Sequence, residues 1–145
     1  MTLFIAVGSV MGTTDALAKK IIAHCEAHEI QTEFIERIDC DALTAADVIL
    51  VCTSTTGMGD LPASITPLYQ QLSEEQPDIS GIRCAVIALG DSSYPNFAAA
   101  GHRIMTALCD CGAAPALLAQ IDTSEIDDPW PRVREPFEQW ISQQT

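Results

Sequence analysis

The sequence predicts an α/β fold in which a parallel sheet of five strands is covered by helices on both faces. Short apolar runs rich in β-branched residues alternate with segments of helical periodicity along the 145 residues. The central runs are apolar at consecutive positions, which is typical of strands buried on both faces of a parallel sheet. No repeat or linker interrupts this alternation. We therefore expect one compact three-layer α/β/α domain over residues 1–145.

The predicted elements follow in order along the chain. Strands are expected at residues 2–7, 32–36, 47–53, 83–89 and 116–121. Helices are expected at residues 15–28, 63–75 and 96–111, followed by a last helix with the apolar residues Val133, Phe137, Trp140 and Ile141.

The start of the last helix and the link at residues 37–46 are the least defined parts of this prediction. Pro131 suits a first helical turn, whereas proline inside a helix costs about 3 kcal/mol. The last helix is therefore expected either to begin near residue 135 or to be kinked at Pro136. The link between the second and third strands has room for only one helical turn.

Charge and hydropathy narrow the choice of partners. Seven basic and twenty acidic residues give a formal net charge of -13, which repels nucleic acids and anionic membrane surfaces. No apolar run is long enough to span a bilayer, and the N-terminus lacks the basic residues of a secretory signal. We expect an acidic, cytoplasmic, monomeric protein whose partners present basic surfaces.

The cysteines and histidines predict no metal site. The cysteines fall mostly in apolar segments and are expected to be buried and reduced; they are Cys25, Cys40, Cys52, Cys84, Cys109 and Cys111. Cys109 and Cys111 are separated by about 200° on a predicted helix, which disfavours binding of one metal by both. The three histidines, His24, His28 and His102, are expected on helix faces without forming a ligand cluster.

The loop at residues 8–14, GSVMGTT, is the first of four loops expected to converge beyond the carboxyl ends of the strands. The others are residues 54–62, 90–97 and 122–130. The first loop lacks the lysine of a Walker motif and the G-x-G-x-x-G dinucleotide fingerprint. The aspartates that a phosphoacceptor receiver domain needs after its first and third strands are also missing.

The remaining groups of this loop are uncharged hydrogen-bond donors. Hydroxyls of Ser9, Thr13 and Thr14, with backbone amides exposed by a turn at Gly12, predict a neutral cradle for one terminal phosphate. Each hydrogen bond to an ionised group contributes roughly 1.5–3 kcal/mol, so several can replace a cation. The alternative is that these hydroxyls only cap the helix that begins near Asp15.

The second and third loops add groups suited to a planar ligand. CTSTTGMGDLP, at residues 52–62, combines hydroxyl residues with Gly57 and Gly59, which adopt positive φ readily. LGDSSYPNF, at residues 89–97, presents Tyr94 and Phe97 after Gly90. An aromatic ring there either stacks on a ligand or packs against the protein.

Together, SVMGTT, STTGMGDLP and LGDSSYPNF resemble the three flavin loops of the flavodoxin family, in particular its short-chain bacterial members and the FMN-binding domains of diflavin reductases. The resemblance covers essentially the whole chain and implies a sheet of strand order 2-1-3-4-5 that binds FMN. It implies phosphate contacts from Ser9, Val10, Met11, Gly12, Thr13 and Thr14. It implies isoalloxazine contacts from Ser54, Thr55, Thr56, Gly57, Met58, Gly59, Leu89, Gly90, Asp91, Tyr94, Asn96 and Phe97.

Within that site, the resemblance gives particular roles to three positions. Tyr94 is the expected stacking ring. The Gly57–Met58 peptide matches the one whose carbonyl turns toward flavin N5 when the flavin gains one electron and a proton. Thr56 stands where many relatives have an aromatic residue, which implies weaker binding or a more exposed flavin.

The function implied is transfer of single electrons from an NADPH-dependent flavodoxin or ferredoxin reductase to an acceptor enzyme. The chemistry belongs to FMN, so no residue is predicted to be catalytic. The alternatives are an FMN-dependent NAD(P)H quinone reductase and a non-redox binding or regulatory module.

Acidic residues near the predicted flavin suggest an electrostatic role. They are Asp60, Asp91, Asp122, Glu125, Asp127 and Asp128. Our hypothesis is that their negative field lowers the potential of the reduced flavin and guides a basic partner. The alternative for the acids of the fourth loop is a solvated surface turn.

Overall fold

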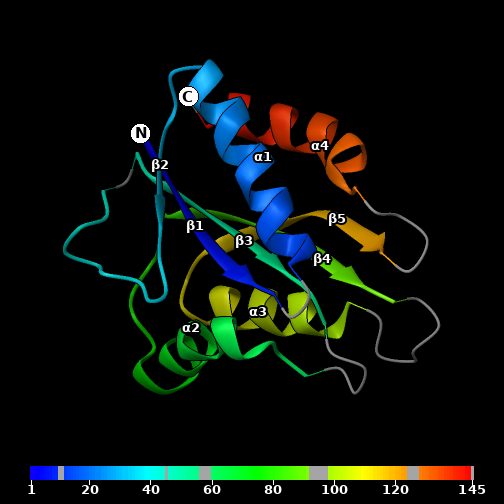
Figure 1. The fold of residues 1–145 in the computed structure, drawn as a ribbon. Helices are drawn as coiled ribbons and strands as arrows, with labels where there is room; N and C mark the ends of the chain where they lie inside the picture. The colour runs from blue at the N-terminus through cyan, green and yellow to red at the C-terminus, as the bar shows by residue number, and fades with distance from the viewer. Residues whose placement is uncertain (10–11, 45, 56–59, 92–97, 124–127, 145) are drawn as a thin grey trace.

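The chain forms a five-stranded parallel sheet of order β2-β1-β3-β4-β5, as predicted (Figure 1). The structure, a computed structural model, describes residues 1–9, 12–44, 46–55, 60–91, 98–123 and 128–144. The strands are β1 (Thr2–Gly8), β2 (Gln31–Phe34), β3 (Val48–Thr53), β4 (Arg83–Gly90) and β5 (Ala114–Asp122). Every residue of β3 is buried, which explains its continuous apolar sequence.

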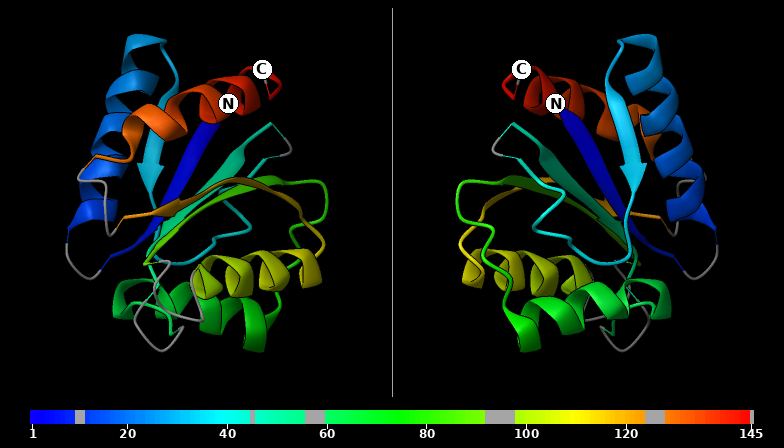
Figure 2. Two further views of the ribbon diagram at one scale, coloured as in Figure 1. Left: turned by 90° about the vertical axis from the view of Figure 1, so that its right-hand side faces the viewer. Right: turned by 90° about the vertical axis from the view of Figure 1, so that its left-hand side faces the viewer.

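Helices cover both faces of the sheet (Figure 2). They are α1 (Thr13–Ala27), α2 (Thr66–Gln70), α3 (Ala99–Asp110) and α4 (Trp130–Ser142). Side chains of α1 and α4 pack on one face around Leu3, Ile5 and Leu50. Residues of α2 and α3 pack on the other face around Ile49 and Val51. The alternation of strand side chains between these two clusters follows from the period of two in a β-strand.

The predicted helix at residues 63–75 is present over the same residues but is not uniform. It is a 3₁₀ turn (Ala63–Ile65), then α2, then a π turn (Gln71–Glu75). Within the π turn, the Gln71 side chain is buried and bonds to both backbone groups of Ile38, at 2.7 Å and 2.6 Å. Hydrogen bonds therefore hold Ile38, in the link between β2 and β3, against this helix. The described residues of 37–46 form turns and bends without a helix.

The last helix begins before residue 135, which was one of the two predictions for it. It starts at Trp130 with a proline in its first turn and continues through Pro136, so a start near residue 135 is wrong. Val133, Phe137 and Ile141 are buried against the sheet and α1. Burying a side chain of this size contributes about 1.5–3 kcal/mol, so together these residues outweigh the cost of the internal proline.

Other boundaries differ by one to three residues. β2 ends at Phe34, two residues early, and β5 begins two residues early at Ala114. The described part of α3 begins after Ala98, whose φ of 62° interrupts the helical backbone. Residues 96–97, predicted as the start of this helix, lie outside the described residues. α3 ends at Asp110, so Cys111 closes the helix and does not lie within it.

The six cysteines are free thiols, but not all are buried as predicted. Cys40 and Cys109 are exposed, the first on the link that follows β2 and the second on the outer side of α3. Burial raises the pKa of Cys52 and of Cys84 to about 12, which keeps both thiols protonated at neutral pH. None of the helices in the described part of the chain is long and apolar enough to cross a membrane.

Gly101 allows α3 to approach β4 closely. A Cβ atom at this position would lie 2.4 Å from Ala88 Cβ. We expect Gly101→Ala to lower the free energy of unfolding by about 1–3 kcal/mol, despite the better helix propensity of alanine, because the helix must move away from the sheet. Urea unfolding measures the change. Combining Gly101→Ala with Ala88→Gly should recover part of the loss, and an independent, additive effect of the two changes would contradict the close contact.

Asp47 is a buried carboxylate held by hydrogen bonds at the start of β3. Its oxygens accept from Thr2 N at 2.8 Å, Thr44 N at 3.0 Å and Thr44 Oγ1 at 3.1 Å. Burial by itself raises the pKa of Asp47, but these hydrogen bonds outweigh it and leave the pKa below its usual value. The ionised carboxylate therefore stabilises the folded chain above the unfolded-state pKa of about 3.9, and this stabilisation is lost as the pH falls through the lower folded-state pKa.

Replacing Asp47 by asparagine should lower the free energy of unfolding at pH 7 by about 1–3 kcal/mol, because an amide group then faces donors. The difference from the parent should shrink as the pH falls below about 4. Denaturant unfolding at pH 7 and pH 3.5 measures both effects, with the exposed Asp41→Asn as the control. A difference independent of pH would contradict the role of the charge.

Candidate functional site

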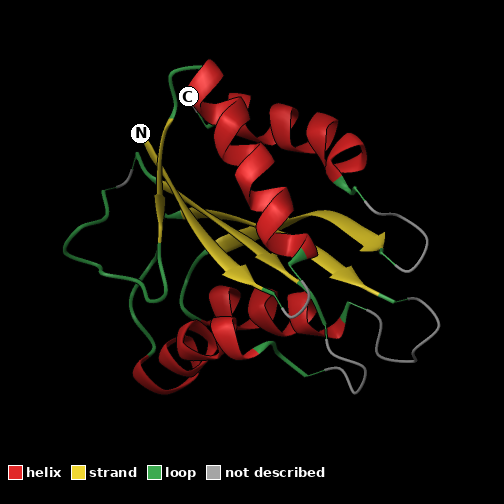
Figure 3. Ribbon diagram, in the orientation of Figure 1, coloured by secondary structure: helices red, strands yellow, loops and turns green. Residues whose placement is uncertain are grey.

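The carboxyl ends of β1, β3, β4 and β5 lie along one edge of the sheet (Figure 3). Direct bonds join the loops that leave them. Gly8 O at the end of β1 accepts from Ser54 N at 2.8 Å and from Ser54 Oγ at 3.2 Å. Gly90 O at the end of β4 accepts from Thr123 N at 2.9 Å. The described parts of the four predicted loops therefore converge, as expected.

The first loop turns into α1 at Gly12. This glycine has φ 84° and ψ -9°, a left-handed conformation that residues with a side chain rarely adopt. A Cβ there would meet no atom within 4 Å, so backbone conformation and not space requires the glycine. Gly12 N donates to Ser9 Oγ at 3.1 Å, and Gly12 O accepts the first helical bond, from Ala16 N at 3.0 Å.

Thr14, in the first turn of α1, has a buried hydroxyl without a hydrogen-bond partner among the described residues. The residue is 1% exposed. A buried hydroxyl without a partner costs free energy, so such groups are rare in folded proteins. In the described part of the chain no side chain caps the start of α1, which argues against a capping role for this hydroxyl. The first amides of a helix also lack acceptors within the helix. The start of α1 therefore has donors to offer to a ligand.

Ser64 holds the first loop in place and was not predicted from the sequence. Ser9 N donates to Ser64 Oγ at 3.0 Å, and Ser64 Oγ donates to Val7 O at 3.2 Å. Gly8 permits this approach, since a Cβ at Gly8 would lie 2.9 Å from Ile65 Cβ. The serine is 55 positions from Ser9 in the chain. No sequence pattern connects two residues so far apart.

The second and third loops are described in part. Ser54 and Thr55 are half-buried, and Thr55 Oγ1 accepts from Ala100 N at 3.2 Å in the first turn of α3. Leu89 is buried in the core beside α1 and α4, so its side chain is committed to packing. Asp91 is half-buried directly after Gly90. The described groups of these loops thus bring hydroxyl and backbone groups to the same edge as the first loop.

Half of the predicted site lies outside the described residues. These positions are Val10, Met11, Thr56, Gly57, Met58, Gly59, Tyr94, Asn96 and Phe97. The structure brings together Ser9, Gly12, Thr13, Thr14, Ser54, Thr55, Gly90 and Asp91 at one edge of the sheet. Among the described residues, no three His, Cys, Asp or Glu side chains are placed to hold a metal ion.

The acidic residues around this edge differ in their surroundings. Asp128 forms an ion pair with Lys20 on α1 and accepts from Trp130 N at 3.1 Å. The lysine and then this amide lower the pKa of Asp128 below its ordinary value. Asp60 is exposed and Asp122 is half-buried, whereas Glu125 and Asp127 lie outside the described residues. The charge of Asp128 is thus balanced by a neighbouring cation.

Comparison with known proteins is consistent with this architecture. A family model described as Flavodoxin matches residues 5–140. Flavodoxin YqcA of Pectobacterium carotovorum subsp. carotovorum is 38% identical over 131 residues, which cover 89% of this chain and 86% of that protein. The sulfite reductase (NADPH) flavoprotein alpha-component of Mannheimia succiniciproducens is 29% identical over 85% of this chain and 21% of its own length.

A solved structure of a point mutant of flavodoxin from Pseudomonas aeruginosa has the same fold. Its TM-score to this chain is 0.77 at 32% identity, and the alignment covers 99% of this chain and 95% of that one. The family match extends from β1 to α4 and includes all four loops at the carboxyl edge of the sheet. The chain belongs to the flavodoxin family.

Proposed function

We propose that this chain binds FMN and carries single electrons between redox partners. The observation that carries the proposal is the buried hydroxyl of Thr14, which has no partner among the described residues and stands at the start of α1. A phosphate oxygen would give this hydroxyl an acceptor. Family membership supports both parts of the proposal, since it implies FMN binding and since flavodoxins are typically electron carriers.

The residues of the first loop fit the phosphate of FMN. Such a phosphate carries about -1.5 to -2 charges at neutral pH, and the positive end of the α1 dipole favours an anion. Ser9, Thr13 and Thr14 would supply hydroxyl donors, and the first turn of α1 would supply amides. Gly12 would enclose the phosphate through its turn, and the predicted contacts from Val10 and Met11 complete the loop. The donors are uncharged, so this part of the site suits one terminal phosphate and not a di- or triphosphate.

The ring system would lie along the ends of β3 and β4. Ser54, Thr55, Gly90 and Asp91 stand at these ends. The remaining predicted contacts belong to this proposal, including Thr56–Gly59, stacking by Tyr94, and Asn96 and Phe97. FMN supplies the redox chemistry when it is bound, and the chain binds and orients it. We assign no acid, base or nucleophile to any side chain.

The proposed partners are an NADPH-dependent reductase as donor and an acceptor enzyme, both docking through basic surfaces. The formal charge of -13 supports complementary docking. The relative from Mannheimia succiniciproducens is named as a component of an NADPH enzyme, which supports this source of electrons. The proposal also includes a single domain over residues 1–145, a monomeric state and a cytoplasmic location.

Replacing Thr14 by valine tests the phosphate cradle. Valine has nearly the same shape but lacks the hydroxyl, so the apoprotein should be as stable as the parent or more stable by about 1 kcal/mol. The loss of a hydrogen bond to an ionised phosphate should weaken FMN binding about 10- to 150-fold. Fluorescence titration of the apoprotein with FMN and denaturant unfolding without FMN measure the two effects.

The matched control for this substitution is Thr32→Val on β2, away from the first loop. It should leave FMN affinity unchanged. Parent-like affinity in the Thr14→Val variant would contradict the assigned phosphate contact, and failure of the parent to take up FMN would favour the non-redox module.

An assay of electron flow separates the carrier from a self-contained quinone reductase. We expect the FMN-loaded protein, mixed with NADPH and a quinone, to show no sustained NADPH oxidation. In a sample without the quinone, adding a flavodoxin reductase to the protein and NADPH should bleach the visible absorption of the flavin, because a carrier needs a separate donor. Sustained turnover without the added reductase would refute the carrier proposal in favour of the enzyme.

A further inference from the structure

Two imidazole rings lie together at the C-terminal end of α1. His24 is in the last turn of the helix, and His28 is the residue that closes it. Their ring centroids are 4.3 Å apart and their planes are inclined by 31°. Residues four positions apart share one side of a helix, which is how helical metal sites place two histidines on one ion. From the sequence we expected no such grouping of histidines.

The Nδ1 atom of each ring faces an oxygen atom, and in His28 this contact determines where the proton lies. His28 Nδ1 is 2.8 Å from His24 O, and a carbonyl only accepts, so this nitrogen carries the hydrogen. His24 Nδ1 faces the carboxylate of Glu138 on α4, with 3.7 Å between Nδ1 and Oε1. In a neutral ring that is protonated at Nδ1, Nε2 keeps its lone pair.

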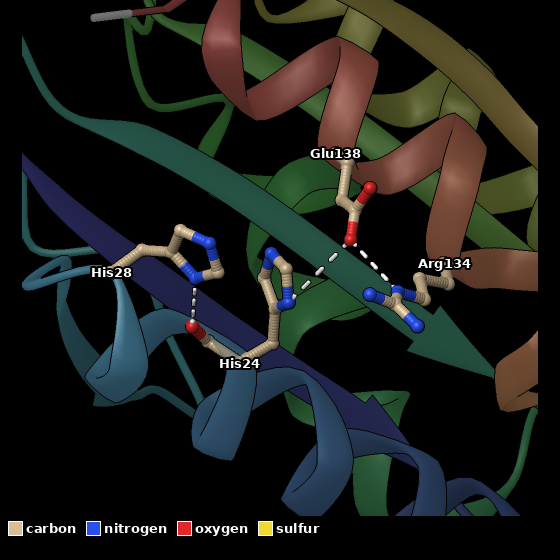
Figure 4. Close-up of polar contacts among 4 residues, drawn as sticks. All are labelled: His24, His28, Arg134 and Glu138. Carbon is tan, nitrogen blue, oxygen red and sulfur yellow. Dashed lines mark hydrogen bonds and ion pairs between the residues drawn. The ribbon is translucent and has the colours of Figure 1, made fainter.

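Figure 4 shows that the Nε2 atoms of both rings lie on the side turned away from the backbone of α1. Histidines that bind metals have this arrangement, in which one nitrogen donates to a carbonyl or carboxylate while the other binds the ion. Of the two ring nitrogens of His28, only Nδ1 contacts the end of the helix, so binding a metal through Nε2 leaves the cap intact.

Neighbouring aromatic rings orient His24. Trp130 and Phe137 of α4 have their ring centroids 5.7 Å and 5.9 Å from that of His24. The side chain of His24 is only 12% exposed, whereas His28 is exposed. An open pocket of about 670 Å³ lies beside the two rings and is lined by Ile30, Ile141 and Ser142 among others. One ring is therefore fixed by packing, and the space beside the pair admits a hydrated ion.

The charges around the pair allow a cation to bind. Glu138 places a carboxylate beside the pair, with its Oε1 3.7 Å from His24 Nδ1. The guanidinium of Arg134 repels a cation, but it is bonded to Glu138 at 2.9 Å. The negative end of the α1 dipole also favours positive charge at this position.

We propose that Nε2 of His24 and Nε2 of His28 together bind one divalent transition-metal ion, such as Zn²⁺ or Ni²⁺. Imidazole suits these ions, whereas Mg²⁺ and Ca²⁺ require oxygen ligands. Water completes the coordination, because the described residues supply no third metal-binding side chain. Glu138 is a positioning residue that faces His24 Nδ1. The site lies at the opposite end of α1 from the proposed phosphate cradle and does not depend on FMN.

Calorimetric titration with Ni²⁺ at pH 7.5 tests the proposal. The parent for this experiment is the full chain with Cys40→Ser and Cys109→Ser, so that the exposed thiols do not compete for the metal. We expect one ion per chain, and an affinity at least tenfold lower in each of the variants His24→Asn and His28→Asn. The control is His102→Asn on α3. It removes a ring whose Nε2 lies 3.0 Å from Gln120 Oε1 on β5, and it should leave the Ni²⁺ affinity unchanged.

Ring-proton NMR gives a readout that does not rely on the variants. Substoichiometric Ni²⁺ should broaden the signals of His24 and His28 before those of His102. Since His28 is exposed, its replacement should preserve the fold even if that of His24 does not. Parent-like Ni²⁺ affinity in the His28→Asn variant, or equal broadening of all three histidines, would overturn the proposal.

Discussion

The parallel pairing of β1 with β3 is the constraint on which the edge of the sheet depends. The register runs from Leu3 opposite Val48 to Gly8 opposite Thr53, so both strands end at the same level. The carbonyl of Gly8 then accepts from Ser54, which joins the first loop to the second. Because Gly8 has no side chain, the turn that carries Ser64 approaches closely enough to hold the amide of Ser9. A larger residue at Gly8 would separate these three segments.

Uncharged hydrogen-bond donors explain how a chain of negative net charge could bind an anionic phosphate. The protein has thirteen more acidic than basic residues, yet we propose that its first loop binds an anion. Hydrogen bonds act over about 3 Å, whereas exposed charges are screened over about 8 Å at physiological ionic strength. Under the proposed function, local donors such as the hydroxyls of Ser9 and Thr14 would bind the phosphate, and the distant acids would still attract a basic partner. Lys20, on the same helix, is engaged with Asp128.

Helix α1 connects the two proposed sites, which have opposite charge preferences. Its first turn presents amides, and its last turn presents carbonyls, one of which accepts from His28. The helix dipole thus favours an anion at Gly12 and a cation near His24. At each end, α1 carries polar atoms that do not take part in the hydrogen bonds of the helix. The hydroxyl of Thr14 has no partner among the described residues, and the Nε2 atoms of His24 and His28 face away from the helix.

Local sequence patterns predicted the strands, most of the helices and the positions of the loops at the carboxyl edge of the sheet, because hydrophobic periodicity and the turn at Gly12 are local properties of the chain. Two features depend on tertiary packing: the start of α4 at Trp130, where burial outweighs the cost of Pro136, and the exposure of Cys40 and Cys109. Tertiary packing also placed Ser64 against Ser9 and Glu138 against His24. The spacing of His24 and His28 is visible in the sequence, but the contact between their rings is not. The start of α4, the exposed cysteines and the contacts of Ser64 and Glu138 depend on residues far apart in the chain. A local sequence pattern holds no information about the free energy of such contacts.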